Sequence, residues 1–191
     1  MNSLSRARVG PKILRLLLTS ALLVLFTNVC GYGDPVMKLS STAFTNGGKI
    51  PVSHVMPGAG GQNISLPLEW ADAPAGTKSF ALSIIDPHPI AHNWVHWLVI
   101  NLPGDVHALA AGASGKKMPP GALELNNSFG SPGYGGPQPP PGSGDHPYVV
   151  TVYALSVPHL DLGRQTTLAA FQQALEGKVL ASATITGYFG R

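Results

Sequence analysis

The stretch "DPHPIAHNWVHWLVINLP", residues 86–103, decides the fold. Its first eight residues hold two prolines and an asparagine, which favour a turn, and the remainder is apolar on both faces, as in a central strand. The preceding segment "KSFALSIID", residues 78–86, alternates like a half-buried strand. Together they predict an antiparallel hairpin in which Asp86 lies opposite Trp94 and diagonal to His96.

Side-chain alternation predicts which residues of this hairpin share a face. One set is Phe80, Leu82, Ile84 and Asp86, and the other is Trp94, His96, Leu98 and Ile100. A buried imidazole needs a hydrogen-bond partner for its N–H group, and a carboxylate is a good one. We therefore expect Asp86 to pair with His96, either as a buried structural pair or as part of a site.

The chain after residue 34 predicts one mainly-β domain without internal repeats. The expected elements are strands at 36–44, 64–70, 148–157 and 179–189 and one helix at 166–178. Pro67 marks its strand as an edge or bulged strand. Thr166 or Thr167 can cap the helix, and Gly177 ends it. Two loops rich in glycine and proline are expected at 103–122 and 130–147.

The N-terminal segment has the features of a secretory signal. Four basic residues within the first fifteen precede an apolar run at 16–26, which is shorter than the roughly 20 residues of a membrane span. We expect residues 1–31 to be a cleaved signal peptide and residues 32–191 to be the exported domain. An uncleaved membrane anchor is the alternative.

Cys30 is the single cysteine of the chain. It follows the apolar run, where a bacterial lipoprotein would be cut and lipidated, although ordinary cleavage after Gly31 is equally compatible with the sequence. The exported domain has no disulfide. We expect a periplasmic protein, or one that is anchored to the membrane and faces the periplasm.

The charge of the exported domain argues against a nucleic-acid partner. Four of the twelve lysines and arginines lie in the predicted signal and none of the nine acidic residues does, so the domain has a net charge of about −1. Nucleic-acid binding needs clustered basic charge.

A second region with potential for chemistry is "NNSFGSPGYGGPQPPPGSGDHPY", residues 126–148. Strong strand signals flank it, so we interpret it as a rigid, shaped loop rather than a linker. Glycines let backbone amides face a ligand, and prolines stiffen the chain. His146 and Tyr148, at its end, have strand spacing and share a face.

Several motifs in order resemble the phosphatidylethanolamine-binding protein family, in its bacterial Raf kinase inhibitor-like branch. They are "LPLEWADAPAGTKSFALSIIDPHP" (66–89), "NWVHWLVINLP" (93–103), "NNSFGSPGYGGPQPPPGSGDHPYVVTVYAL" (126–155) and "VLASATITGYF" (179–189). The resemblance implies a β-sandwich with one or two short helices and a small pocket at one end. In the family, that pocket takes phosphate-like and carboxylate-like anions, including the headgroup phosphate of phosphatidylethanolamine.

The resemblance also implies the residues of the pocket. The expected ligand-binding residues are Asp86, Trp94, His96, Gly136, Pro139, Pro140, His146 and Tyr148, with Gly133 and Tyr134 shaping the rim. Two imidazoles and loop amides near Gly136 would bind an anion without lysine or arginine, and Asp86 would hold one ring in position. Because an anion favours protonated histidine, affinity should weaken as pH rises through the histidine pKa.

Three positions depart from the family pattern. His88 replaces the second acid of the D-P-D-x-P turn, which makes the mouth less acidic. Ser128 replaces the aspartate of N-D-F-G, which weakens a predicted brace of the loop. Pro147 replaces the arginine of H-R-Y, which removes a charge and a backbone donor.

We expect a non-enzymatic binding protein for a small anion or a phospholipid headgroup, with no cofactor. The alternative is an inhibitor that acts on a protease or kinase through the pocket rim. The sequence leaves open whether the protein forms a homodimer.

Two other classes are weaker. His88, His92 and His96 are four residues apart, but the turn removes the helical geometry that would suit a metal. No G-x-S-x-G motif marks a hydrolase, and no contact between Ser143 and His146 is predicted.

Overall fold

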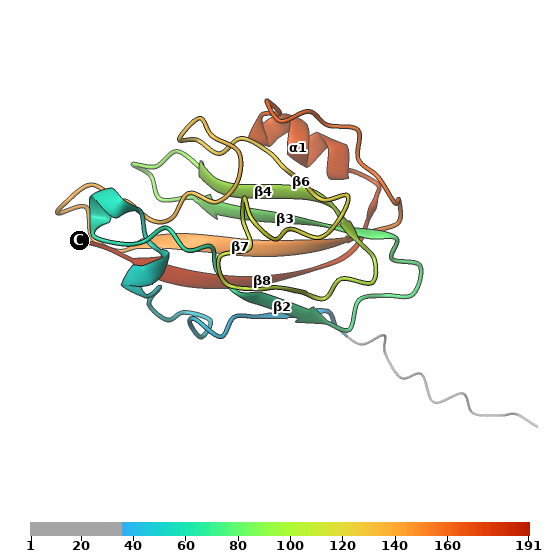
Figure 1. Cartoon of the computed structure of the whole chain (residues 1–191), viewed down its shortest axis with the longest axis horizontal. Coiled ribbons are helices and arrows are strands. Elements are labelled where there is room, and N and C mark those ends of the chain that lie inside the picture. Colours follow the sequence, from blue (N-terminus) through green and yellow to red (C-terminus); the bar gives the residue numbers. More distant parts are fainter. Residues whose placement is uncertain (1–35) are drawn as a thin grey trace, which may run out of the picture. The chain divides into compact units, whose positions relative to one another are not determined.

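The computed structural model describes residues 36–191. The predicted signal peptide and Cys30 lie outside these residues. Within them the chain forms two β-sheets, one α-helix and two short 3-10 helices, at Val52–His54 and Pro57–Ala59 (Figure 1). The predicted β-sandwich is confirmed.

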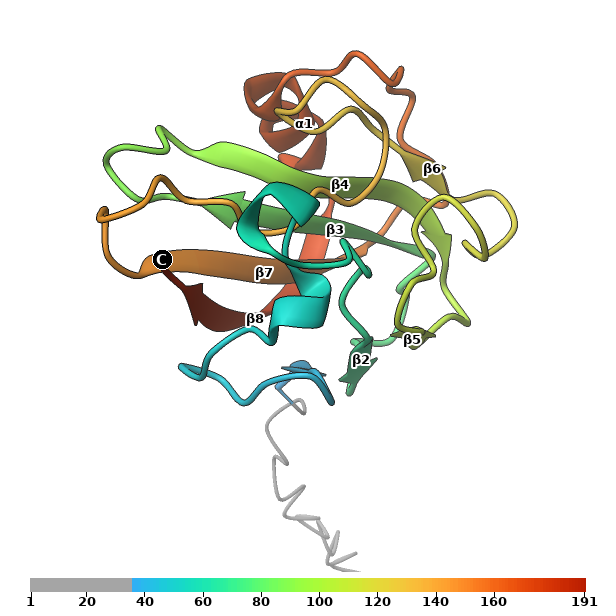
Figure 2. The same ribbon diagram turned by 60° about the vertical axis from the view of Figure 1, so that its left-hand side comes forward.

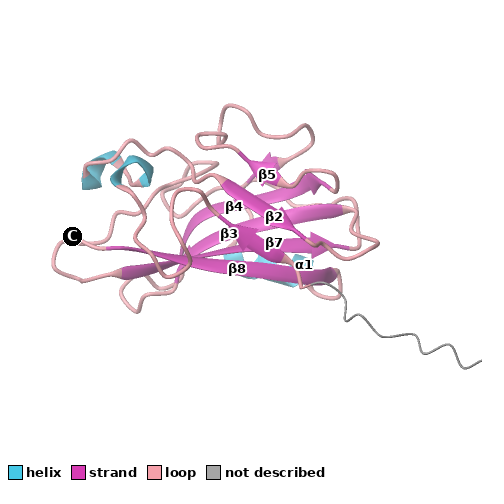
Figure 3. Cartoon of the chain, turned by 90° about the horizontal axis from the view of Figure 1, so that it is seen from below, coloured by secondary structure: helices cyan, strands magenta, loops and turns pink. Residues whose placement is uncertain are grey.

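The larger sheet has five antiparallel strands. Their spatial order is β6 (Leu123–Glu124), β4 (Trp94–Pro103), β3 (Ser79–Asp86), β7 (His146–Leu155) and β8 (Val179–Phe189). The smaller sheet has the order β1 (Lys38–Ser40), β2 (Leu68–Ala71) and β5 (Ala108–Leu109). It packs below β7 and β8 in the view of Figure 1, and Figure 3 shows the two sheets from below. The strand predicted at 36–44 is shorter than expected, because β1 covers only Lys38–Ser40. The strand predicted at 64–70 begins only after Pro67, which has no N–H to donate to a neighbouring strand.

A hydrophobic core fills the space between the two sheets. Phe80, Leu82 and Ile84 point into it from β3, as the alternation predicted, and Trp70 of β2 meets Phe80 edge to face at 5.5 Å. Both aromatic side chains are fully buried, and burial of each contributes about 3 kcal/mol by its apolar area. This core fixes the position of β3, which carries Asp86 at its end.

The opposite face of the larger sheet is covered by α1 (Leu168–Leu175). Thr167 caps the helix by accepting a hydrogen bond from the Ala170 N–H at 3.2 Å. Phe171 and Leu175 share the buried side and join a second apolar cluster on the sheet. Gly177 follows the helix in a left-handed conformation, with φ of 69°. Residues with side chains rarely adopt this conformation, so glycine is favoured here.

A β-bulge interrupts the central hairpin at His96. The register shifts between the pairs Ile84–Trp97 and Ile85–Val95, so His96 is the extra residue on β4. Such a bulge turns a side chain toward a face that strict alternation would not give it.

The bulge corrects one prediction. Trp94 and His96 face the same cavity, but Leu98 and Ile100 lie in the cluster beneath α1, on the opposite face of the sheet. The expected common face for all four residues was therefore wrong. The chain changes face at the bulge, which places a polar ring beside Tyr148 instead of beneath the helix.

Several connections meet at one end of the sandwich. They are the β3–β4 turn, the loop leading into β7 and the segment with the two 3-10 helices (Figure 2). The Met56 N–H donates to the Pro137 carbonyl at 3.0 Å, and the Tyr134 hydroxyl donates to the His54 carbonyl at 2.8 Å. These contacts tie the 3-10 segment to the loop and build a fixed frame around the cavity described next. Among residues 36–191, no helix is long and apolar enough to cross a membrane.

Candidate ligand-binding site

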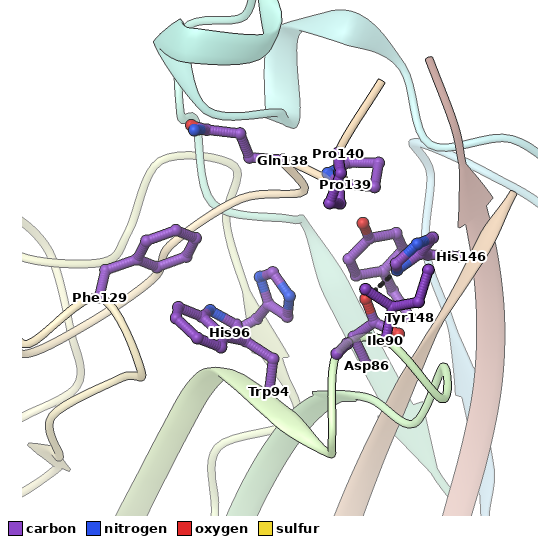
Figure 4. A pocket seen from close by; sticks show the side chains of 11 residues that line it. Asp86, Ile90, Trp94, His96, Phe129, Gln138, Pro139, Pro140, His146 and Tyr148 are labelled. Carbon is purple, nitrogen blue, oxygen red and sulfur yellow. Dashed lines mark hydrogen bonds and ion pairs between the residues drawn. The ribbon is translucent and has the colours of Figure 1, made fainter. Parts of the chain in front are cut away.

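A cavity of about 350 Å³ opens at this end of the sandwich (Figure 4). Its lining residues are Asp86, Ile90, Ala91, Trp94, His96, Phe129, Gln138, Pro139, Pro140, His146 and Tyr148. Seven of the eight predicted site residues are in this set. Sequence reasoning missed Ile90, Ala91, Phe129 and Gln138, although each lies within a loop that it had marked.

Asp86 binds His146 rather than His96. The His146 Nδ1–H donates to Asp86 Oδ2 at 2.6 Å, and both side chains are buried. The other carboxylate oxygen accepts the backbone N–H of His88 at 2.8 Å. The predicted Asp86–His96 pair was therefore wrong. Asp86 does lie opposite Trp94, as predicted, but β7 supplies the imidazole that reaches its carboxylate.

The hydrogen bond of His96 determines its tautomer. Its Nδ1 lies 2.6 Å from the carbonyl oxygen of Gly135, and a carbonyl can only accept, so Nδ1 carries the hydrogen. Burial lowers the pKa of His96 to about 4, more than the carbonyls of Gly135 and Gly136 and the Asp86 carboxylate raise it. At neutral pH the ring is uncharged, and its Nε2 is a hydrogen-bond acceptor.

Tyr148 lines the cavity and has a buried, unpaired hydroxyl. The side chain is 1% exposed, and its hydroxyl has no hydrogen-bond partner among the described residues. Its ring meets His96 edge to face at 4.9 Å. Burial, followed by the nearby Asp86 carboxylate, raises the Tyr148 pKa, so the hydroxyl keeps its hydrogen. An unsatisfied buried hydroxyl costs about 1–3 kcal/mol, which a ligand would recover.

Ser143 contacts His146, which the sequence did not predict. The Ser143 Oγ lies 3.0 Å from His146 Nε2 and 2.7 Å from the Pro140 carbonyl. With Asp86, these residues have the connectivity of a nucleophile–base–acid triad. However, the Ser143 N–H is engaged by the Pro140 carbonyl, and Ser143 does not line the cavity. The backbone amide of Ser143 is therefore not free to donate a hydrogen bond to an oxyanion. The contact instead holds the His146 ring in position.

Two loop residues lie elsewhere than expected. The Gly136 N–H donates to Asn63 Oδ1 at 2.7 Å, so this amide is not available to a ligand. A side chain at Gly136 would meet the His54 carbonyl, which explains the glycine. Tyr134 is buried, packs on Trp97 at 5.6 Å and lies in the core, so its predicted place at the rim was wrong.

The three departures from the family pattern are accommodated. The His88 ring stacks on His146 with centroids 3.8 Å apart. Ser128 braces the loop, because its hydroxyl accepts the Val95 N–H at 2.9 Å and its own N–H donates to the Val95 carbonyl. Pro147 pairs with Tyr188 in the β7–β8 ladder.

The mouth of the cavity is apolar. Ile90, Trp94 and Phe129 line it and are 56%, 38% and 37% exposed. Trp94 and Phe129 meet edge to face at 5.3 Å. The cavity thus has a polar floor and an apolar mouth. Within residues 36–191 no group of three or more histidine, cysteine or acidic residues could hold a metal ion.

The family model described as "Phosphatidylethanolamine-binding protein" matches residues 40–190. The chain therefore belongs to the phosphatidylethanolamine-binding protein family. Its similarity to two Escherichia coli proteins places it in a bacterial branch. YbhB is 42% identical over 158 residues, covering 80% of this chain and 99% of YbhB. YbcL is 36% identical over 155 residues, covering 78% of this chain and 85% of YbcL.

Solved structures agree with this assignment. The crystal structure of E. coli YbcL, described as a new member of the mammalian family, matches with a TM-score of 0.78 and 34% identity, covering 82% of this chain and 99% of YbcL. The phosphatidylethanolamine-binding protein of Plasmodium vivax matches with a TM-score of 0.52 and 15% identity, covering 83% of this chain and 87% of that protein, and it supports the fold alone.

Proposed function

We propose that the chain is a non-enzymatic binding protein whose cavity takes one small oxyanion. The ligand is a phosphate-like or carboxylate-like group, on a small phosphorylated molecule or a phospholipid headgroup. Asp86, Trp94, His96, Pro139, Pro140, His146 and Tyr148 are the ligand-binding residues of this proposal.

The unpaired Tyr148 hydroxyl carries the proposal. A buried polar group without a partner is rare in folded proteins, and this one belongs to a residue that lines the cavity. An oxyanion oxygen would accept its hydrogen. The volume of about 350 Å³ lies at the low end for small-molecule sites and suits a compact group.

The rigidity of the cavity supports binding rather than turnover. The Asp86–His146–Ser143 chain and the His96–Gly135 bond fix both imidazoles without a ligand. Preorganised groups lose little entropy when a ligand binds. The triad-like connectivity lacks its expected amide donor, as described above, so no acyl-transfer step is proposed.

Calorimetric titration with phosphoethanolamine at pH 6 tests this function. The purified protein should bind one equivalent, and Tyr148→Phe should weaken binding at least tenfold. Tyr153→Phe is the matched control, since Tyr153 lies on the same strand outside the cavity and bonds Ser83. Equal affinity of the wild-type protein and Tyr148→Phe would contradict the proposal.

The apolar mouth favours one alternative, an inhibitor that docks a protein target on the rim. Exposed aromatic side chains are typical anchors of protein interfaces. Trp94→Ala would then abolish inhibition of that target, whereas Tyr148→Phe would leave inhibition intact.

Export is also part of the proposal. The sequence of residues 1–31 supports it, as does LppC of Mycobacterium tuberculosis, named as a candidate lipoprotein and 34% identical over 153 residues. If Cys30 is lipidated, wild-type protein will fractionate with membranes and Cys30→Ala will not. Equal fractionation of the two would exclude lipidation at Cys30 as the anchor.

A further inference from the structure

The hydroxyl of Ser143 has one hydrogen, which it donates to the Pro140 carbonyl. The two oxygens lie 2.7 Å apart, and a carbonyl can only accept, so the hydrogen lies between them. The Ser143 oxygen also lies 3.0 Å from His146 Nε2, and it has only lone pairs left for this contact. The contact is therefore a hydrogen bond only if Nε2 itself carries a hydrogen.

The other ring nitrogen of His146 carries a hydrogen as well. Its Nδ1 lies 2.6 Å from Asp86 Oδ2, and the second carboxylate oxygen accepts the His88 N–H. Acceptance at both oxygens favours the ionised form of Asp86. Hydrogens on both nitrogens make His146 an imidazolium cation, so the Asp86–His146 pair has no net charge.

The ring of His88 stacks on this cation with centroids 3.8 Å apart. His88 Nδ1 accepts the Ile90 N–H at 3.4 Å, so this nitrogen carries no hydrogen and the ring is uncharged. An uncharged aromatic face beside a cation is favourable, whereas two stacked cations would repel each other. The stack thus holds one positive charge, and that charge lies on the buried ring of His146.

Two further titratable groups line the same cavity, and both are uncharged at neutral pH. Burial lowers the pKa of His96, on β4, to about 4. Burial raises the pKa of Tyr148, on β7. Neither residue therefore adds charge to the cavity floor.

The charged groups of the adjoining loop and the last residue are engaged elsewhere. Asp145 pairs with Lys49, and Arg191 binds backbone groups of the loop through its side chain and its backbone oxygen. Among the described residues, no lysine or arginine lines the cavity. The net charge of the floor is therefore set by the Asp86–His146 pair.

We propose that Ser143 is a positioning residue that keeps the hydrogen on His146 Nε2 and thereby makes the cavity floor electrically neutral. The inference rests on the proposed function and names the group that lets this site accept an anion. Without that hydrogen, the Asp86 carboxylate would leave one negative charge at the floor, which would repel an oxyanion. Because the device acts through charge alone, it admits phosphomonoesters and phosphodiesters alike, including the phosphate of an intact phospholipid.

NMR of the imidazole nitrogens tests the hydrogen assignment in the purified protein without ligand. At pH 7, both nitrogens of His146 should carry hydrogen, whereas His96 should carry it on Nδ1 alone. Ser143→Ala should lose the Nε2 hydrogen of His146 at a lower pH than the wild-type protein, and Ser143→Thr, which retains a hydroxyl, should behave like the wild type. A His146 ring with a single hydrogen in the wild-type protein at pH 7 would overturn the inference.

Calorimetry with dimethyl phosphate measures the consequence for binding. This phosphodiester keeps one negative charge from pH 5.5 to pH 8, and comparison of two proteins at each pH cancels the groups that they share. Ser143→Ala should match the wild-type affinity at pH 5.5 and bind about tenfold more weakly at pH 8, and Ser143→Thr should restore the affinity. Ser156→Ala is the matched control, because the Ser156 hydroxyl donates to the Lys178 carbonyl, far from the cavity lining.

The outcomes separate the inference from the proposed function. An affinity ratio of Ser143→Ala to wild type that is the same at both pH values would overturn the role of Ser143 and keep the oxyanion site. Failure of the wild-type protein to bind either dimethyl phosphate or phosphoethanolamine would overturn the proposed function and the role of the pair in binding. The NMR experiment would still decide the hydrogen assignment in that case.

Discussion

The Asp86 carboxylate accepts a 2.6 Å hydrogen bond from His146 across 60 residues of sequence. Both side chains are buried, and they lie at the end of β3 and the start of β7. The pair therefore fixes the edge of the cavity where two neighbouring strands meet. It also orients the ring whose other nitrogen contacts Ser143.

Asp86→Asn should lower the free energy of unfolding by about 2 kcal/mol, because it replaces a buried charge-assisted hydrogen bond with a neutral one. Urea unfolding at pH 7 measures this change. Asp105→Asn is the control, since Asp105 is exposed and should change stability by less than about 0.5 kcal/mol. Equal stability of the two variants would contradict the role given to Asp86.

Two buried tyrosines should respond in opposite ways to loss of the hydroxyl. Tyr134→Phe removes a hydrogen bond to the His54 carbonyl and should destabilise the protein by about 1–2 kcal/mol. Tyr148→Phe removes an unpaired hydroxyl and should leave stability unchanged or raise it by about 1 kcal/mol, while ligand binding weakens at least tenfold. Thermal unfolding of both variants without ligand checks this. Destabilisation by Tyr148→Phe would show that the hydroxyl has a structural partner.

Stability should fall as the solution is acidified from about pH 6.5 to pH 4. The folded-state pKa of His96, about 4, lies below the ordinary value of 6.5, so the unfolded chain binds more protons in this range. The contribution of His96 is fully present above pH 6.5 and is lost as pH falls to 4, by up to about 3 kcal/mol.

Urea unfolding across this range measures the loss. His96→Gln, which cannot titrate, should lack this part of the pH dependence. If His96→Gln keeps the wild-type dependence of unfolding free energy on pH, groups other than His96 cause the acid destabilisation.

The sequence predicted the hairpin, its Asp86–Trp94 pairing and most of the cavity lining, because strand alternation and motif order carry that information. It missed the bulge at His96, because in a strand that is apolar on both faces the residue pattern does not show where an extra residue shifts the following side chains to the other face. It also missed contacts that only the folded chain creates. The partner of Asp86 lies 60 residues away, and the Asn63 side chain that occupies the Gly136 amide lies 73 residues away.

The most direct test of the oxyanion site observes the histidine rings themselves. NMR chemical shifts of the imidazole nitrogens should show His96 as the Nδ1–H tautomer without ligand. Addition of phosphoethanolamine at pH 6 should shift the His96 and His146 signals saturably, and Tyr148→Phe should reduce that response. His54 is the internal reference, because its Nδ1 is bound to the Ile64 carbonyl and it does not line the cavity. Unchanged His96 and His146 signals, or equal shifts at His54, would contradict an oxyanion site between these rings.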